Sequence, residues 1–191
     1  MMRRVAAIAV AVALLPALGG CVSAMDVLDV VFPEPGPEEP YVPSPEELVV
    51  PERFTIIPDP WQAEYVGVLD DGRRYFVTAD VDLLAATGYV SIYYWAADGS
   101  FESADIRKVG PLDEIESGGL SAAEGVRQGQ LAGATIEPIT VAPFSVEKNG
   151  TTFGFIARGP DPEYYDVASV THVPNDDMVY YWPWDGEGYD T

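Results

Sequence analysis

Short apolar runs joined by tight, glycine-containing turns limit the fold of this chain more than any other feature of its sequence. Asn149-Gly150 separates Ile139–Glu147 from Thr151–Arg158, and both Asp70-Asp71-Gly72 and Asp98-Gly99 stand between similar runs. A two-residue hairpin turn needs positive φ at its central positions, which Asn-Gly adopts most readily. These turns therefore predict antiparallel β-hairpins.

The runs are short and recur from residue 63 to residue 182. Together with their turns they predict a mainly β fold of the α+β class, with about eight short strands in an antiparallel sheet, sandwich or barrel. Tyr89–Ala96 carries apolar side chains on both faces, which is typical of a central strand. The expected strands are Ala63–Leu69, Arg73–Thr78, Tyr89–Ala96, Phe101–Val109, Ile139–Glu147, Thr151–Arg158, Asp166–Val173 and Met178–Trp182.

One helix is expected between the strands, from Ser121 to Leu131. Ser121 and Glu124 have the spacing of a capping box. Gly125, Gly129 and Gly133 lie four residues apart, so we expect a glycine face that lets the helix backbone pack closely on the sheet. The alternative is a glycine-rich loop.

An acidic, proline-rich stretch precedes the strands. Val22–Glu52 has seven prolines and eight carboxylates but no Lys or Arg. Prolines remove backbone donors and like charges repel, so this stretch is expected to be an extended tether. We therefore expect a tether over residues 21–52 and one β-rich domain over 53–191.

The first 20 residues have the pattern of a secretory signal. Arg3-Arg4 supplies positive charge, and Val5–Leu18 follows without a charged residue. This apolar run is shorter than the roughly 20 residues that a membrane-spanning helix needs. Residues 1–20 are therefore predicted to be a signal peptide that is removed on export.

Leu18-Gly19-Gly20-Cys21 resembles the lipobox of bacterial lipoproteins. The resemblance implies that a diacylglycerol is attached to the Cys21 thiol, that signal peptidase II cuts before this residue, and that fatty chains such as palmitate anchor the protein. It implies a cell-envelope location, and Val22 favours the outer membrane if the host is Gram-negative. The alternative is an ordinary signal peptide with a chance cysteine near the cut. Cys21 is the only cysteine, so no internal disulfide can form.

The chain is strongly acidic, with 31 Asp and Glu against 10 Lys and Arg. Such a charge repels nucleic acid and anionic lipid surfaces, so we expect no nucleic-acid partner. Adaptation to a salty habitat or a GC-rich genome would also explain the acidity. The expected partners are the membrane, through the lipid anchor, and an envelope protein or glycan.

No catalytic or metal-binding motif is complete. His172 is the only histidine, which excludes a multi-histidine metal site, and its strand position predicts a half-buried, hydrogen-bonded ring. Gly119-Leu-Ser121-Ala-Ala123 lacks the final glycine of a nucleophile elbow. Asp80 and Asp82 would share one strand face, and Asn175-Asp176-Asp177 falls in an expected loop, but a solvated acidic surface is the favoured explanation of these carboxylates. We therefore assign no catalytic residue, metal ligand or cofactor.

The last twelve residues are rich in aromatic side chains. Tyr and Trp combine apolar faces with polar groups and are common at interfaces. One interpretation is a final strand that completes the core. The other is a binding patch for sugar or protein, formed by Tyr180, Tyr181, Trp182, Trp184, Asp185 and Tyr189.

Three segments of the domain are similar to those of small uncharacterised bacterial proteins: Val141-Ala-Pro-Phe-Ser-Val146, Phe153-Gly-Phe-Ile156 and Pro183-Trp-Asp-Gly186. This resemblance implies no activity. The sequence thus favours a non-catalytic envelope lipoprotein that binds a partner. An immunity-type inhibitor of a basic toxin and a hydrolase using Asp80, Asp82, Asp176 and Asp177 are the alternatives.

Overall fold

The computed structural model describes residues 41–111, 125, 127–131, 133–161 and 166–190. Residues 43–191 group into one compact unit, and residues 1–42 do not belong to it. Residues 43–52, expected to belong to the tether, therefore group with the folded unit. Within them Pro45–Leu48 forms a 3₁₀ helix, η1, and the Glu47 carbonyl accepts a hydrogen bond from the Ala168 amide at 2.7 Å.

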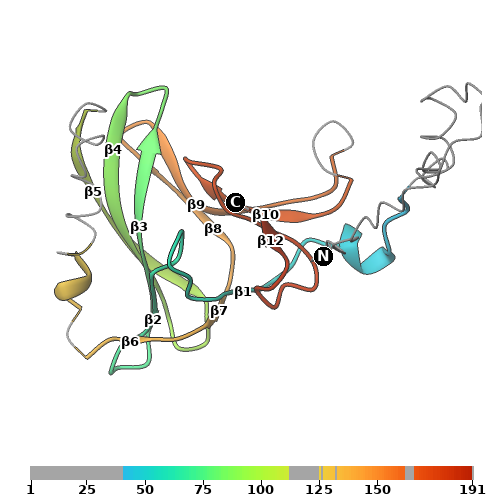
Figure 1. Cartoon of the computed structure of the whole chain (residues 1–191), viewed down its shortest axis with the longest axis horizontal. Coiled ribbons are helices and arrows are strands. Elements are labelled where there is room, and N and C mark those ends of the chain that lie inside the picture. The colour runs from blue at the N-terminus through green and yellow to red at the C-terminus, as the bar shows by residue number, and fades with distance from the viewer. Residues whose placement is uncertain (1–40, 112–124, 126, 132, 162–165, 191) are drawn as a thin grey trace, which may run out of the picture. The chain divides into compact units, whose positions relative to one another are not determined.

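Two five-stranded antiparallel sheets make up most of this unit (Figure 1). The first sheet has the order β5 (Phe101–Pro111), β4 (Thr87–Trp95), β3 (Arg74–Asp82), β2 (Tyr65–Val68) and β6 (Thr135–Ile136). The second has the order β12 (Tyr189–Asp190), β11 (Val179–Tyr180), β10 (Ser169–Val173), β9 (Thr151–Arg158) and β8 (Phe144–Lys148). A separate pair joins β1 (Phe54–Ile56) to β7 (Ile139–Val141). The expected mainly β, antiparallel fold is confirmed.

The predicted hairpin turns are also confirmed. β2 pairs with β3 across Gly72, and β8 pairs with β9 across Asn149-Gly150. Asn149 and Gly150 have φ of 56° and 85°, as a tight hairpin turn requires. β4 lies between β3 and β5, in the central position expected from its two apolar faces.

The strand expected over Ile139–Glu147 is wrong, because it is two strands in different sheets. β7 ends at Val141 and pairs with β1, whereas β8 begins at Phe144 and pairs with β9. Pro143 stands at the break and has no amide hydrogen to continue a ladder. The Ala142 carbonyl instead accepts a hydrogen bond from the buried Trp95 indole at 3.0 Å. The short strands β1, β6 and β12 were not expected from the sequence.

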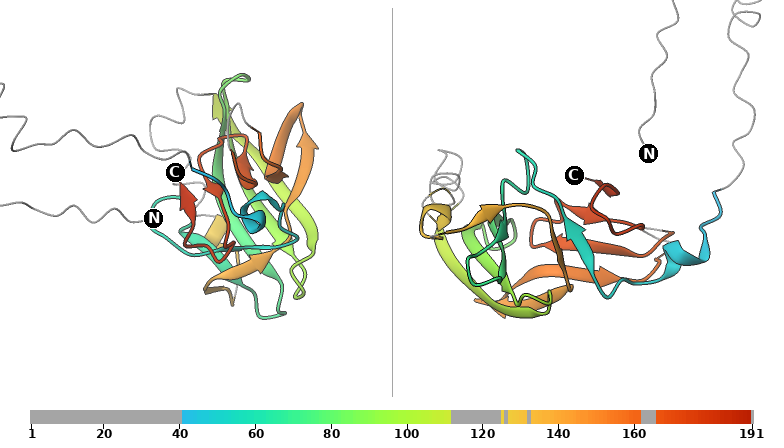
Figure 2. Two further views of the ribbon diagram at one scale, coloured as in Figure 1. Left: turned by 90° about the vertical axis from the view of Figure 1, so that its right-hand side faces the viewer. Right: turned by 90° about the horizontal axis from the view of Figure 1, so that it is seen from below.

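The two sheets face each other (Figure 2), and aromatic rings fill the space between them. Phe76 of β3 packs on Phe155 of β9 with ring centroids 5.6 Å apart, and Tyr89 of β4 packs on Phe153 at 5.0 Å. The opposite face of the first sheet carries a second buried cluster, formed by Tyr75, Val77, Val90 and Ile92. The first sheet is therefore apolar on both sides.

Residues 125 and 127–129 are helical, and residues 121–124, where we expect the helix to begin, lie outside the described part. The expected close packing is wrong for Gly125 and Gly129, because a Cβ added at either would meet nothing within 4 Å, whereas a Cβ added at Gly133 would collide with the Asp70 carboxylate. The buried Arg127 holds this segment instead. Its Nη2 donates to the Asp105 carboxylate at 2.7 Å, and Gln128 Nε2 lies 3.2 Å from the Tyr75 hydroxyl.

Candidate functional site

The single histidine lies between two carboxylates in the interior. His172 is on β10 and is 0% exposed. Its Nδ1 donates to Asp177 Oδ1 at 2.9 Å, and its Nε2 lies 3.3 Å from Oδ1 of Asp80 on β3, without the geometry of a hydrogen bond. The expected hydrogen bond is present, but the expected half-burial is wrong because β3 covers the ring.

Polar side chains surround both carboxylates. Asp80 Oδ2 accepts from the Ser91 hydroxyl at 3.0 Å and from the Tyr93 hydroxyl at 3.2 Å, both on β4. Asn175 Nδ2 donates to Asp177 Oδ2 at 3.0 Å. Asn175 Oδ1 accepts from the Val81 amide at 2.6 Å, so this loop of the second sheet is also bonded to β3.

The electrostatics of this cluster favour a protonated histidine. Burial alone would lower the pKa of His172, but the hydrogen bond to Asp177 and the charge of Asp80 outweigh burial and raise it. Burial raises the pKa of Asp80 despite the nearby histidine. Burial would also raise the pKa of Asp177, but the hydrogen bond from His172 lowers it.

This cluster joins the sheets, and of its three residues only Asp177, with 28% of its side chain exposed, reaches solvent. Asp80 and His172 are both fully buried, so neither touches a dissolved molecule in this conformation. Asp82 shares a face with Asp80, as expected, and accepts a hydrogen bond from Thr151 of the second sheet. We therefore call His172, Asp80 and Asp177 the inter-sheet lock and look for a binding site elsewhere.

The aromatic patch expected at the end of the chain is only partly at the surface. Tyr180 is 3% exposed and packs on Phe54 with ring centroids 4.9 Å apart, so its assignment to the patch is wrong. Its position on β11 points the ring into the core. Trp182 is 45% exposed and Asp185 is exposed. Tyr181, Trp184 and Tyr189 are partly buried.

A loop that was not predicted to be functional lies against this segment. Asp59, between β1 and β2, accepts from the Tyr189 hydroxyl at 2.7 Å through Oδ2. Its Oδ1 accepts from the amides of Trp61 at 2.7 Å and Gln62 at 2.8 Å. Burial alone would raise the pKa of Asp59, but these three donors outweigh it and lower the pKa. Burial and the bond to Asp59 raise the pKa of Tyr189 to about 12.

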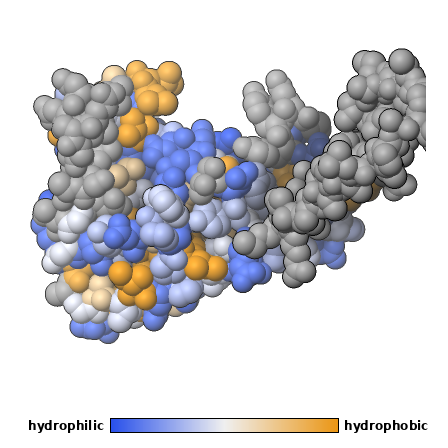
Figure 3. Space-filling view, in the orientation of Figure 1, coloured by the Kyte–Doolittle hydropathy of each residue, from blue (hydrophilic) through white to orange (hydrophobic). Residues whose placement is uncertain are grey.

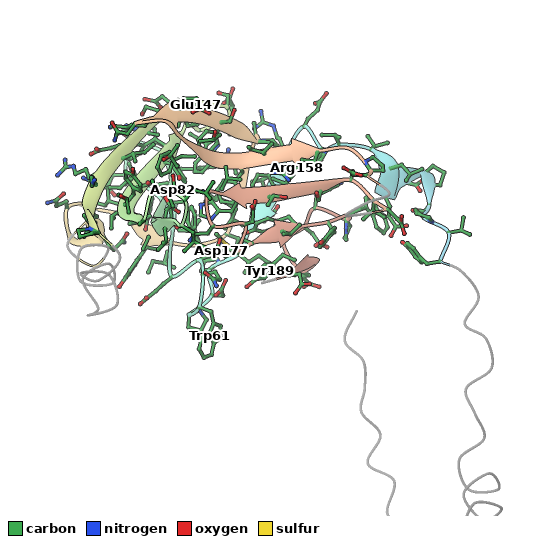
Figure 4. All side chains as sticks on the ribbon, turned by 90° about the horizontal axis from the view of Figure 1, so that it is seen from above. Trp61, Asp82, Glu147, Arg158, Asp177 and Tyr189 are labelled. Atoms are coloured by element: carbon green, nitrogen blue, oxygen red, sulfur yellow. The ribbon has the colours of Figure 1, made fainter. Side chains whose placement is uncertain are left out.

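Trp61 is 85% exposed, and Figure 4 shows it standing out from the strands on the side where Tyr189 also lies. A shallow groove of about 260 Å³ lies next to it, lined by Pro58, Asp59, Pro60 and Glu64. We call residues 57–64 together with 181–190 the Asp59 surface. The only sequence indication of this loop is Asp59-Pro60-Trp61, a tryptophan in a turn-forming context.

Two other surface features of the described residues are an exposed apolar hairpin tip and a cavity beside Arg73. Leu83 and Leu84 are exposed between β3 and β4, and Figure 3 shows apolar atoms at this hairpin tip. A cavity of about 320 Å³ is lined in part by Asp71, Arg73 and Tyr94, with Arg73 stacked over the Tyr94 ring.

Within the described part of the chain, no group of three or more His, Cys, Asp or Glu side chains is placed to hold a metal ion. No helix there is long and apolar enough to span a bilayer. Cys21 and Ser121 lie outside the described residues.

Comparison with known proteins yields no family model, no curated protein and no solved structure that matches this chain.

Proposed function

We propose that this protein is an exported, lipid-anchored envelope protein whose domain is a non-catalytic binding module. The signal pattern of residues 1–20 and the lipobox-like sequence at Cys21 support the anchor. The acidic, proline-rich stretch after Cys21 suits a spacer that keeps the domain away from lipid headgroups. The binding site in this proposal is the Asp59 surface.

The observation that carries the proposal is the exposure of Trp61 on an ordered loop. Burying a large apolar side chain stabilises a protein by about 1.5–3 kcal/mol, and an exposed Trp61 forgoes most of this gain. Asp59 nevertheless holds the loop with two backbone donors and ties it to Tyr189. A large aromatic side chain on a pre-ordered loop loses little entropy on binding, which suits an anchor at an interface.

A retrieval experiment tests the binding role. The acyl anchor is replaced by an affinity tag, and the protein is incubated with envelope fractions of its own organism, both protein and insoluble cell wall. We expect Trp61→Ala to lose a partner that the unmodified domain retains. Leu84→Ala is the matched control, because it removes another exposed apolar side chain at a distant hairpin tip.

Thermal unfolding of each variant shows whether the domain is intact. Loss of the partner in Trp61→Ala with retention in Leu84→Ala supports the proposal. Equal retention by both variants, or no retained partner at all, overturns it.

The lipid anchor is tested separately by mass spectrometry of the protein from its own organism. We expect a mature chain that begins at Cys21 and carries fatty acyl chains. Cys21→Ser is expected to prevent this processing. A free thiol at Cys21, or a chain that begins elsewhere, would contradict the anchor while leaving the binding role open.

A further inference from the structure

We propose that the Asp59 surface binds a cationic polypeptide segment, with an Arg or Lys side chain seated on the face of Trp61. This inference rests on the proposed binding function and names the chemistry of the partner.

The first support is the distribution of charge. The segments 54–72 and 159–191 contain no Lys or Arg at all, and the Asp59 surface is built from parts of these two segments. This surface contains Asp59 and Glu64 from the loop between β1 and β2, and Asp185 and Glu187 from the turn before β12. Thr55 donates its amide to the Trp184 carbonyl at 2.8 Å, which fixes this turn next to β1.

Elsewhere in the described part of the domain, some acidic side chains have basic neighbours. Arg73 pairs with Asp71 at 2.8 Å, Arg127 pairs with Asp105 at 2.7 Å, and Arg158 lies 3.9 Å from Asp176. The Asp59 surface has no such residue in its own segments, so its negative potential is available to a partner. Complementary charge of this kind steers association and selects a cationic partner.

The second support is the exposed ring itself. A guanidinium or ammonium group over an aromatic face is attracted by the ring, most strongly by tryptophan. The same chemistry occurs within this molecule, where Arg73 Cζ lies 5.3 Å from the centre of the Tyr94 ring and also pairs with Asp71. Trp61 and its neighbouring carboxylates would give a cationic side chain of a partner the same two contacts, an aromatic face and a carboxylate.

The third support is the groove beside Trp61. Pro58 and Pro60 form apolar walls, and Asp59 and Glu64 complete the lining. Arg and Lys lay their aliphatic stems along apolar surface while the charged end meets a carboxylate. A neutral sugar can donate its hydroxyls to these carboxylates but has no charge to complement theirs, and an anionic glycan or lipid headgroup would be repelled. These observations favour a basic polypeptide.

The test uses the full mature chain with its anchor replaced by a tag. The probe is a peptide of alternating glycine and arginine, and a peptide of alternating glycine and glutamate is the reference. Binding is followed by calorimetry and by the Trp61 indole resonance in NMR spectra. We expect the arginine peptide to bind and shift this resonance, the glutamate peptide to do neither, and affinity to fall as salt is added.

Variants separate a specific site from general attraction to an acidic protein. Trp61→Ala is expected to weaken binding by roughly threefold or more, and Glu64→Gln and Asp185→Asn should each weaken it as well. Glu147→Gln is the matched control, because it removes one exposed carboxylate on β8, away from Trp61 in Figure 4. The control is expected to leave the affinity unchanged.

Failure of this inference is distinguishable from failure of the binding function. If Glu147→Gln weakens the peptide as much as Glu64→Gln does, the attraction is non-specific and the inference is overturned. It is also overturned if the domain retains a cell-wall glycan through Trp61 but ignores the arginine peptide, although the binding function then stands. Retention of no partner at all overturns both.

Discussion

His172 of the second sheet lies 3.3 Å from Asp80 of the first sheet, measured from Nε2 to Oδ1, and both side chains are fully buried. The facing layers of the sandwich therefore meet through two titratable side chains as well as through aromatic rings. A buried charge is costly unless it is paired. A shift of β3 against β10 would separate His172 from Asp80 and leave both buried without this contact.

The first prediction concerns the ionisation of the lock. His172 is the only histidine, so a single imidazole signal is followed by NMR as pH rises. We expect its pKa above the ordinary value of 6.5, because Asp177 and Asp80 stabilise the cation. A measured pKa below 6.5 would show that burial dominates and that the ring is neutral in the folded protein.

Stability should follow this titration. The folded protein binds the His172 proton more tightly than the unfolded chain does, so this stabilisation is complete below about pH 6.5 and is lost as pH rises through the folded pKa. The lowered pKa of Asp177 acts in the opposite window and is lost as pH falls below about 4. Burial disfavours the charged form of Asp80 and raises its pKa, so the ionisation of Asp80 also lowers the free energy of unfolding as pH rises.

Urea unfolding at about pH 6 and about pH 9 tests this expectation, and the free energy of unfolding should be larger at the lower pH. Equal values would contradict the expectation.

Removing one residue of the inter-sheet lock should strongly destabilise the domain. Asp80→Ala leaves the buried His172 ring without its partner on β3, and we expect the free energy of unfolding to fall by about 3–5 kcal/mol. The exposed Glu147→Ala serves as a control, with an expected change within about 0.5 kcal/mol. A loss below about 1 kcal/mol for Asp80→Ala would mean that Asp80 does not help to hold the sheets together.

The next prediction concerns the order of the Trp61 loop. Tyr189→Phe removes the hydroxyl that donates to Asp59, a bond of 2.7 Å to a charged acceptor. Such a bond contributes about 1.5–3 kcal/mol when buried and less at this partly exposed position. We expect faster hydrogen exchange at the amides of Trp61 and Gln62, with no change at the Gly72 turn. Unchanged exchange in the loop would show that Tyr189 does not order it.

Two glycines make a matched pair. Gly129 is helical and open to solvent, so Gly129→Ala should stabilise the domain by up to about 1 kcal/mol. At Gly67 on β2, an added Cβ would collide with the Thr135 carbonyl of β6, so Gly67→Ala should be destabilising and should release β6. Thermal unfolding of both variants measures the difference, and a stabilising Gly67→Ala would be inconsistent with the pairing of β2 and β6.

The candidate surface could be predicted only in part. The aromatic composition of residues 180–191 indicated an unusual segment, and Trp182 and Asp185 are indeed exposed. The burial of Tyr180 was not foreseen, because it depends on β11 pairing with β10 and on contact with Phe54. The role of Asp59 was missed because Tyr189, which it binds, is 130 residues away.

The sequence by itself determined the hairpins and the β class. Turn residues such as Asn149-Gly150 act on their immediate neighbours, and apolar runs indicate strands without reference to a partner. Tertiary structure alone decided that Ile139–Glu147 divides between two sheets, that His172 meets Asp80, and that Trp61 stands beside the end of the chain. These contacts join residues far apart in the chain, and their energies depend on burial and partner geometry that no local pattern encodes.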